Sequence, residues 1–248
     1  METEFQFDIL PQPDETTCGP TCLHAVYRYY GYDISLDQVI DECPQLGEGG
    51  TLGVLLGCHA LRRGFPATIF TYNLQVFDPT WFKPPLGRLS AKLQAQMDAK
   101  DAPKLHTATN AYLEFLERGG EIFMEDLTAT LIRRYVKRQV PVLTGLSATY
   151  LYRDPREIGP PCQPDDVRGS PAGHFVVLCG YDAPTRGVLV ADPLMPNPFA
   201  TGQHYVVGVD RVICAILLGI LTYDANLLII EPPRKRRRND RVHPDRGR

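Results

Sequence analysis

The first clear hydrophobic pattern in the chain begins at Cys18. From this point the apolar residues recur at helical spacing, and one face of the expected helix carries Cys22, Leu23, Val26, Tyr29 and Tyr30. A polar loop containing a proline precedes Cys18, and Gly31 is of the residue type that commonly follows the last turn of a helix. The pattern therefore predicts a helix that starts at or just after Cys18 and ends at Gly31.

Capping residues predict two further helices in the N-terminal part of the chain. Ser35 and Gln38 have the spacing of a capping box, which would open a short helix that Pro44 ends. Thr51 is expected to cap a third helix that runs to about Gly64. Periodicity elsewhere predicts an edge strand at 5–10, strands at 67–72, 142–150 and 226–230, and helices at 89–99, 111–118, 124–137 and 210–219.

Two apolar runs in the C-terminal half predict a pair of antiparallel strands. Turn residues precede a run that begins at His174, and a second run, which follows a short turn, ends at Asp192. His174 is thus expected where one strand starts, and Asp192 where its neighbour ends. Because these ends lie close together in an antiparallel pair, an imidazole and a carboxylate are expected to meet there.

Cys18, His174 and Asp192 have the chemistry of a thiol nucleophile with its base and its orienting acid. The unpaired N–H groups and the dipole at the start of a helix stabilise a thiolate, which would make Cys18 a reactive nucleophile. A cysteine, a histidine and an acid form the set used in thiol-based acyl transfer. Each residue also has a structural interpretation: a buried cysteine, a histidine held at a strand start, and an aspartate that only ends a strand.

Several motifs occur in an order that resembles a known family of peptidases. Gln12 lies six residues before the sequence Cys-Gly-Pro-Thr-Cys at 18–22, and Tyr-Tyr-Gly follows it. The sequence His-Phe-Val-Val-Leu begins at His174, and Val-Ala-Asp-Pro contains Asp192. In these motifs the chain resembles the papain-like cysteine peptidases of the bacteriocin-leader (double-glycine) type.

The resemblance implies an α+β, papain-like cysteine peptidase fold, in which a helical half with the nucleophile packs on an antiparallel sheet with the histidine and the aspartate. It also implies four catalytic roles. Cys18 would be the nucleophile, His174 the base, Asp192 the orienting acid, and Gln12 a donor to the oxyanion, with an ordinary loop glutamine as the alternative. Thr17 stands where bacteriocin-processing members commonly have an aspartate, so the motifs do not define the substrate.

Three functions are consistent with this set of residues. The leading hypothesis is a cysteine peptidase or amidohydrolase that cleaves a peptide or isopeptide bond through a Cys18 thioester, with His174 as base. An acyl transferase would form the same thioester and pass the acyl group to an amine. A non-catalytic peptide-binding module of the same fold is the third, and the presence of all four motif residues argues against it.

The chain is interpreted as one domain with a tail. Residues 1–231 would form a single papain-like peptidase domain, in which about 78–122 are a helical insertion. Residues 152–173 are long for a connection without regular structure, and such loops are often lids or flexible segments. Residues 232–248 are basic and predict a disordered tail, with a nuclear-import signal or a tether to an anionic partner as alternatives.

Composition narrows the class of protein. Of 248 residues, 44% are hydrophobic and 22% charged, and the net charge of −3 predicts no general attraction to nucleic acid. The seven cysteines include no Cys-x-x-Cys pair, and no phosphate-binding glycine motif is present, so no metal, nucleotide or flavin cofactor is expected. The chain has no signal-peptide pattern, and its longest apolar run, 212–221, is shorter than the roughly 20 residues that span a bilayer. We therefore expect a cytoplasmic protein with reduced cysteines, of undetermined oligomeric state, that acts on a peptide or other amide-containing substrate and not on membranes.

The remaining candidate residues carry weaker signals. Cys22 is expected in the core, with a resolving thiol as the alternative. His24 and His59 lie within helical patterns and are expected to be packed or surface residues. Trp81 and Phe82 are expected to anchor the insertion, although a substrate-contacting wall is the alternative.

Overall fold

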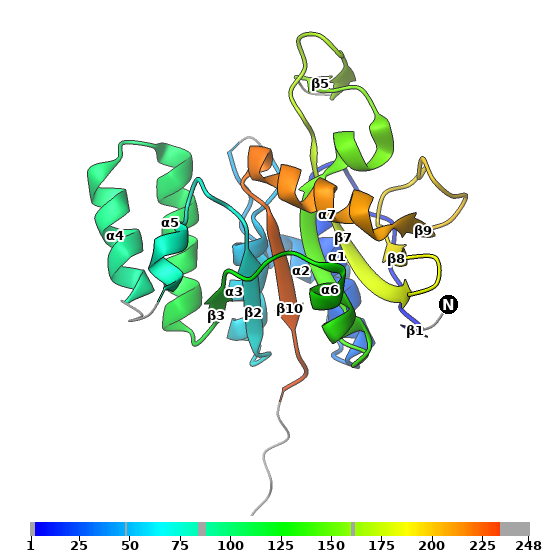
Figure 1. Ribbon diagram of the computed structural model, residues 1–248, viewed down its shortest axis with the longest axis horizontal. Helices are drawn as coiled ribbons and strands as arrows, with labels where there is room; N and C mark the ends of the chain where they lie inside the picture. Colours follow the sequence, from blue (N-terminus) through cyan, green and yellow to red (C-terminus); the bar gives the residue numbers. More distant parts are fainter. Residues whose placement is uncertain (1–2, 48, 84–87, 160–161, 234–248) are drawn as a thin grey trace, which may run out of the picture.

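An eight-stranded sheet runs through the molecule, with helices on both of its faces (Figure 1). The structure is a computed structural model and describes residues 3–47, 49–83, 88–159 and 162–233. The strands lie in the order β3 (Glu121–Phe123), β2 (Ala67–Thr71), β10 (Asn226–Ile230), β4 (Val142–Ser147), β7 (Gly173–Asp182), β8 (Gly187–Ala191) and β9 (His204–Gly208). The short β1 (Thr3–Glu4) also pairs with β7, and the pairing of β2 with β3 is parallel whereas the others are antiparallel. The predicted α+β fold with a mostly antiparallel sheet is confirmed.

The helices divide between the two faces of the sheet. On one face α1 (Cys18–Tyr29) packs on β4 and β7, and α3 (Gly53–Arg62) packs on β2 and β10, with α2 (Leu36–Glu42) beside α1. On the other face lie α6 (Ala129–Val136) and α7 (Val209–Leu218), which are in front of the sheet in Figure 1. The N-terminus of α1, the start of β7 and the end of β8 thereby meet in one region of the molecule.

The helix predicted after Cys18 is α1, and it ends as its sequence predicts. Gly31 follows it with φ +71°, a left-handed conformation that glycine adopts without strain. Ser35 caps α2 by accepting a hydrogen bond from the N–H of Gln38 at 3.2 Å. The side chain of Gln38 donates to Glu42 at 2.8 Å instead of returning to Ser35, so only half of the predicted capping box forms.

Three predicted helix starts were wrong. The residue that directly precedes α3 is Leu52 and not the predicted cap Thr51. The hydroxyl of Thr51 donates instead to the carbonyl of Pro44 at 2.9 Å. Helix α5 (Pro103–Glu117) starts earlier than predicted, because a proline in the first turn of a helix is favourable and does not break it. Helix α6 starts later, after the cap at Thr128, since the residues before it form β3 and a loop. Of the predicted edge strand at 5–10 no residue is in a strand; only β1 precedes it.

The predicted insertion shares the core of the rest of the chain. Its helices are α4 (Leu89–Ala99) and α5, which follow the short 3-10 helix η1 (Pro79–Phe82), and α5 packs on α3. Phe115 is fully buried against Gly57 and Gly120, where a Cβ would lie 2.6 Å and 2.3 Å from its ring. Because of this shared core, we propose that residues 1–231 form one domain.

Most of the predicted tail, 232–248, falls outside the described residues. No helix within the described ranges is both long and apolar enough to cross a membrane.

Candidate active site

The loop before α1 is held in shape by its own polar side chains. Asp14 accepts hydrogen bonds from the N–H and the hydroxyl of Thr16, at 2.7 Å and 2.8 Å. Thr17 donates to the carbonyl of Asp14 at 3.2 Å, and Thr21 donates to the carbonyl of Thr17 at 2.8 Å. This loop places Cys18 as the first residue of α1, where it is 7% exposed.

His174 and Asp192 meet where β7 starts and β8 ends. His174 is the second residue of β7 and lies opposite Leu146 of β4, whereas Asp192 directly follows β8. The Nε2 atom of His174 lies 2.8 Å from Oδ1 of Asp192, and both side chains are buried. The strand pairing thus brings together the imidazole and the carboxylate that the sequence places at these two ends.

The thiol of Cys18 completes a line of three side chains. It lies beside His174: both residues line one pocket, and the Cys18 side chain helps to raise the pKa of the imidazole. Because Nε2 of His174 faces Asp192, Nδ1 is the ring nitrogen left for the thiol. Cys22, one turn further along α1, is fully buried and donates to the carbonyl of Phe175 at 3.3 Å, and burial raises the pKa of its thiol, which fits the predicted core role.

The charges of His174 and Asp192 stabilise each other. Burial alone would lower the pKa of His174, but the Asp192 carboxylate and the Cys18 side chain oppose it and raise that pKa to about 10. Burial alone would raise the pKa of Asp192, but the imidazolium and three further hydrogen bonds lower it. The two opposite shifts describe a buried imidazolium–carboxylate pair that persists at neutral pH.

Two tyrosines that the sequence did not single out also bind Asp192. The hydroxyls of Tyr152 and Tyr205 donate to its Oδ2 at 2.5 Å and 2.7 Å, and the N–H of Leu194 donates to Oδ1 at 2.9 Å. With His174, four donors therefore surround a carboxylate that is 0% exposed. The ring of Phe199 lies 5.5 Å from that of Tyr152 and 5.1 Å from that of Tyr205.

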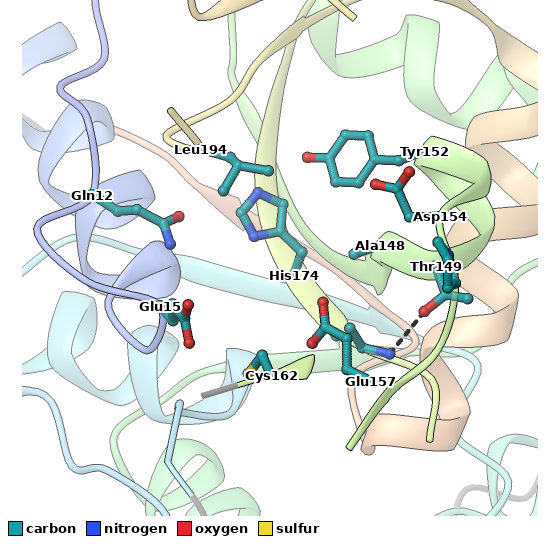
Figure 2. A pocket seen from close by; sticks show the side chains of 13 residues that line it. Gln12, Glu15, Ala148, Thr149, Tyr152, Asp154, Glu157, Cys162, His174 and Leu194 are labelled. Atoms are coloured by element: carbon teal, nitrogen blue, oxygen red, sulfur yellow. Dashed lines mark hydrogen bonds between the residues drawn. The ribbon is translucent and has the colours of Figure 1, made fainter. Parts of the chain in front are cut away.

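Tyr152 comes from the long segment between β4 and β7, which contains more regular structure than the predicted loop. It begins with a short π-helix, η2 (Thr149–Arg153), and continues with a two-stranded ribbon of β5 (Glu157–Ile158) and β6 (Gln163–Pro164). The hydroxyl of Thr149 accepts a hydrogen bond from the N–H of Ala172 at 2.9 Å, which joins the two ends of the segment. This segment forms one wall of the cleft beside His174 (Figure 2).

Gln12 lies beside His174, as Figure 2 shows. Its backbone N–H donates to the carbonyl of Pro193 at 2.9 Å, which ties the N-terminal loop to the residue after Asp192. Its side-chain Nε2 donates to the carbonyl of Asp14 at 2.8 Å, while its Oε1 is buried with no partner among the described residues. One N–H of the amide remains for another acceptor, because an amide nitrogen carries two hydrogens.

Two pockets adjoin His174. The first pocket has a volume of about 220 Å³, and its lining includes Gln12, Glu15, Tyr152, Asp154, Glu157 and His174 (Figure 2). The second pocket has a volume of about 210 Å³, and its lining includes Cys18, Thr51, Lys104, His174, Phe175 and Asp224. Cys18 lines only the second pocket, whereas His174 lines both. This arrangement offers room for a chain on each side of a thiol–imidazole pair.

Comparison with known proteins gives one family and several similar structures. The family described as "Peptidase_C39 like family" matches residues 4–207 of the chain. A C39-like peptidase from Bacillus anthracis is 12% identical, with a TM-score of 0.51, over 93% of this chain and 98% of that one.

Two further structures come from transporters. The peptidase domain of Streptococcus ComA, a bifunctional ABC transporter of a quorum-sensing pathway, is 14% identical, with a TM-score of 0.43, over 92% of this chain and 99% of that one. A double-glycine motif protease from an AMS/PCAT transporter, in complex with its leader peptide, is 13% identical, with a TM-score of 0.44, over 94% of this chain and 96% of that one. No curated protein matches the chain.

Proposed function

The chain belongs to the Peptidase_C39-like family, and from this premise we propose that it is a cysteine peptidase that cleaves a peptide or isopeptide bond. In this proposal Cys18 is the nucleophile, His174 the base, Asp192 the acid that orients the imidazole, and Gln12 a donor to the oxyanion. The observation that carries the proposal is that Cys18 and His174 line the same pocket, while Nε2 of His174 lies 2.8 Å from Oδ1 of Asp192.

Acylation would begin from a thiolate–imidazolium pair, in which Nδ1 of His174 holds the proton of the Cys18 thiol. The sulfur then attacks the carbonyl carbon, and the carbonyl electron pair moves to the oxygen. The free N–H of the Gln12 amide and the backbone N–H of Cys18 at the start of α1 would donate to this oxyanion. When the oxyanion collapses, the C–N bond breaks, His174 protonates the leaving amine, and a thioester remains on Cys18.

Deacylation would reuse the same groups with water. His174, now neutral, takes a proton from a water molecule whose oxygen attacks the thioester carbonyl. The second oxyanion collapses with loss of the Cys18 thiolate, which restores the thiolate–imidazolium pair and releases a carboxylic acid. Throughout the cycle Asp192 would fix Nε2, so that Nδ1 faces the thiol.

The experiment that tests this proposal measures the reactivity of the cysteines. The native protein and a His174→Ala variant are alkylated with iodoacetamide across pH and analysed by mass spectrometry. We expect Cys18 to react faster than the exposed Cys162 and Cys214 near pH 6, and to lose this advantage in the variant. A Cys18 that reacts no faster than those two exposed thiols contradicts the proposed thiolate–imidazolium pair.

A further inference from the structure

Asp224 is a buried carboxyl group in the second pocket that the proposed catalytic cycle does not use. The residue is 5% exposed, yet it lines the pocket that also contains Cys18 and His174. A buried carboxylate is strongly destabilising unless its charge is hydrogen-bonded or paired. An acid beside a proposed nucleophile therefore requires either a structural or a binding explanation.

The surrounding backbone fixes the position of Asp224. Its Oδ1 accepts a hydrogen bond at 2.7 Å from the N–H of Gly53, the first residue of α3, where the helix dipole favours a negative charge. A Cβ at Gly145 would lie 2.6 Å from the Cβ of Asp224, and a Cβ at Gly219 would lie 2.8 Å from its carbonyl oxygen. The preceding Tyr223 adopts φ +70°. Two close glycine contacts and a left-handed residue thus hold this carboxyl in one place.

The ring of Phe175 lies between Asp224 and the start of α1. A Cβ at Gly145 would touch Asp224 and would lie 3.1 Å from Cε1 of Phe175. A Cβ at Gly19, the residue after Cys18, would lie 3.2 Å from Cδ2 of the same ring. Asp224 and Gly19 therefore lie on two sides of the same ring, and Asp224 and Cys18 line the same small pocket. A group bound at Cys18 would extend over Phe175 towards the carboxyl.

The electrostatics of the pocket favour a positive charge beside Asp224. Burial raises the pKa of this carboxyl to about 7, although the N–H of Gly53, the Asn226 side chain and Lys104 lower it. The group is therefore ionised above neutral pH, and its burial makes a close cationic neighbour more stabilising than at the surface. Lys104, which also lines this pocket, is exposed and lies 5.2 Å from the centre of the Tyr223 ring, so water weakens its attraction to Asp224 without abolishing it.

We propose that Asp224 is a specificity-determining residue that binds a positively charged amine on the acyl side of the substrate. This inference rests on the proposed function, because the acyl side is the part that becomes attached to Cys18, and Cys18 lines this pocket. The pocket volume of about 210 Å³ is below the roughly 300 to 1,000 Å³ of sites for drug-sized ligands, so it fits one side chain or a chain end. A lysine side chain and a free amino terminus present the same ammonium group and are the two sources of the amine.

Three chloromethyl ketone probes separate these two sources. Each probe alkylates a cysteine when the thiolate displaces chloride to form a thioether. The first carries lysine with a blocked α-amino group, the second norleucine with a blocked α-amino group, and the third norleucine with a free α-amino group. The labelling rate of Cys18 is measured by mass spectrometry at pH 8, above the pKa of Asp224. We expect the lysine probe or the free-amine probe to react about 10 to 100 times faster than the neutral one, and the faster probe identifies the source.

Variants of the charged residues test whether Asp224 causes this preference. Asp224→Asn keeps an acceptor for Gly53 and nearly the same volume but removes the charge, so the three rates should become similar. Asp41→Asn changes an exposed residue of α2 outside both pockets and should keep the native preference. Lys104→Met, a surface change that leaves Asp224 intact, should increase the preference because it removes a competing cation. A preference that persists unchanged in Asp224→Asn would overturn the inference.

The native protein alone distinguishes failure of this inference from failure of the proposed function. Equal rates for all three probes, together with labelling of Cys18 that depends on His174, would refute the role of Asp224 and leave the peptidase proposal intact. Labelling of Cys18 that is slow with every probe and unaffected by His174→Ala would instead contradict the proposed function. Neither result requires the Asp224 variant to fold.

Discussion

Two tyrosine hydroxyls donate to one oxygen of Asp192, and their removal should change how the stability of the protein depends on pH. The variants are Tyr152→Phe, Tyr205→Phe and the double substitution. Phenylalanine keeps both rings against Phe199, so the main loss is that of the hydrogen bonds at 2.5 Å and 2.7 Å. The change therefore tests the charge of Asp192 and not the packing around it.

The magnitude follows from the pKa of Asp192. Burial raises this pKa, but the charge of His174 and the hydrogen bonds outweigh burial and lower it from 3.8 to about 2. The ionised carboxylate therefore stabilises the fold above pH 3.8 by about 2 kcal/mol, and this contribution is lost as the pH falls through about 2. A hydrogen bond to a charged group contributes about 1.5 to 3 kcal/mol, so the loss of each hydroxyl should raise the pKa by about 1 to 2. In the double variant the folded pKa then reaches or exceeds 3.8, and the contribution disappears.

The assay is urea unfolding at several values between pH 3 and pH 6. Over this range His174, with its pKa raised to about 10, stays protonated in the folded protein, so Asp192 dominates the difference. The difference in unfolding free energy between the native protein and the double variant should be largest above pH 5 and should shrink towards pH 3. Tyr30→Phe removes a hydroxyl that donates to the neutral carbonyl of Ile230 at 2.8 Å, and its effect should not depend on pH. A double variant whose loss of stability is the same at pH 3 and pH 6 would refute the argument.

Two further substitutions have expected outcomes. Gln12→Ala should lower the rate of peptide hydrolysis by about 100- to 1,000-fold, because one oxyanion donor is lost. The reaction of Cys18 with iodoacetamide forms no oxyanion, so its rate should stay near the native value. A parallel fall in both rates would contradict this role of Gln12. Gly145→Ala should lower the free energy of unfolding in urea by about 1 to 3 kcal/mol, since its Cβ would lie 2.6 Å from the Cβ of Asp224. Gly202→Ala, with nothing within 4 Å, is the control, and an equal loss in both glycine variants would show that the close contact is not the cause.

The sequence predicted those parts of the fold that depend on residues close to one another in the chain. The periodicity after Cys18 and the glycine at 31 define α1, because the core face and the final turn of a helix are local properties. Strand β10 was predicted with the bounds it has, since a short apolar run between polar residues is typical of a buried strand. The start of α6 was predicted too early. The chain leaves β3, which pairs with β2 more than fifty residues earlier in the chain, through a loop that ends at the cap Thr128.

The residues around the candidate site were predictable only where a motif marked them. Gln12, Cys18, His174 and Asp192 belong to such motifs. In the structure Gln12 and Cys18 each line a pocket that His174 also lines, and Asp192 contacts His174. Tyr152 has no such mark: it lies in a segment that lacks periodicity, and its partner Asp192 is 40 residues away.

No local pattern in the sequence indicated that Asp224 would be buried. It follows an apolar run, where an aspartate normally indicates an exposed turn. Its burial results from Gly53, Gly145 and Gly219, which approach it from three separate elements. Such burial depends on tertiary contacts that no short stretch of sequence reveals.

The order of these residues along the chain also affects how the protein is synthesised. The side chains around the proposed thiol extend from Gln12 to Asp224, and those that would control its reactivity lie in the second half of the chain. At a translation rate of about 5 to 20 residues per second, Cys18 precedes Asp224 by roughly 10 to 40 seconds. During this interval the nascent polypeptide carries a cysteine without its imidazole, its carboxylate or its pocket. If the proposed function is correct, an unfinished chain would not cleave peptides, because Cys18 would become a reactive nucleophile only after the strands with His174 and Asp192 have been made.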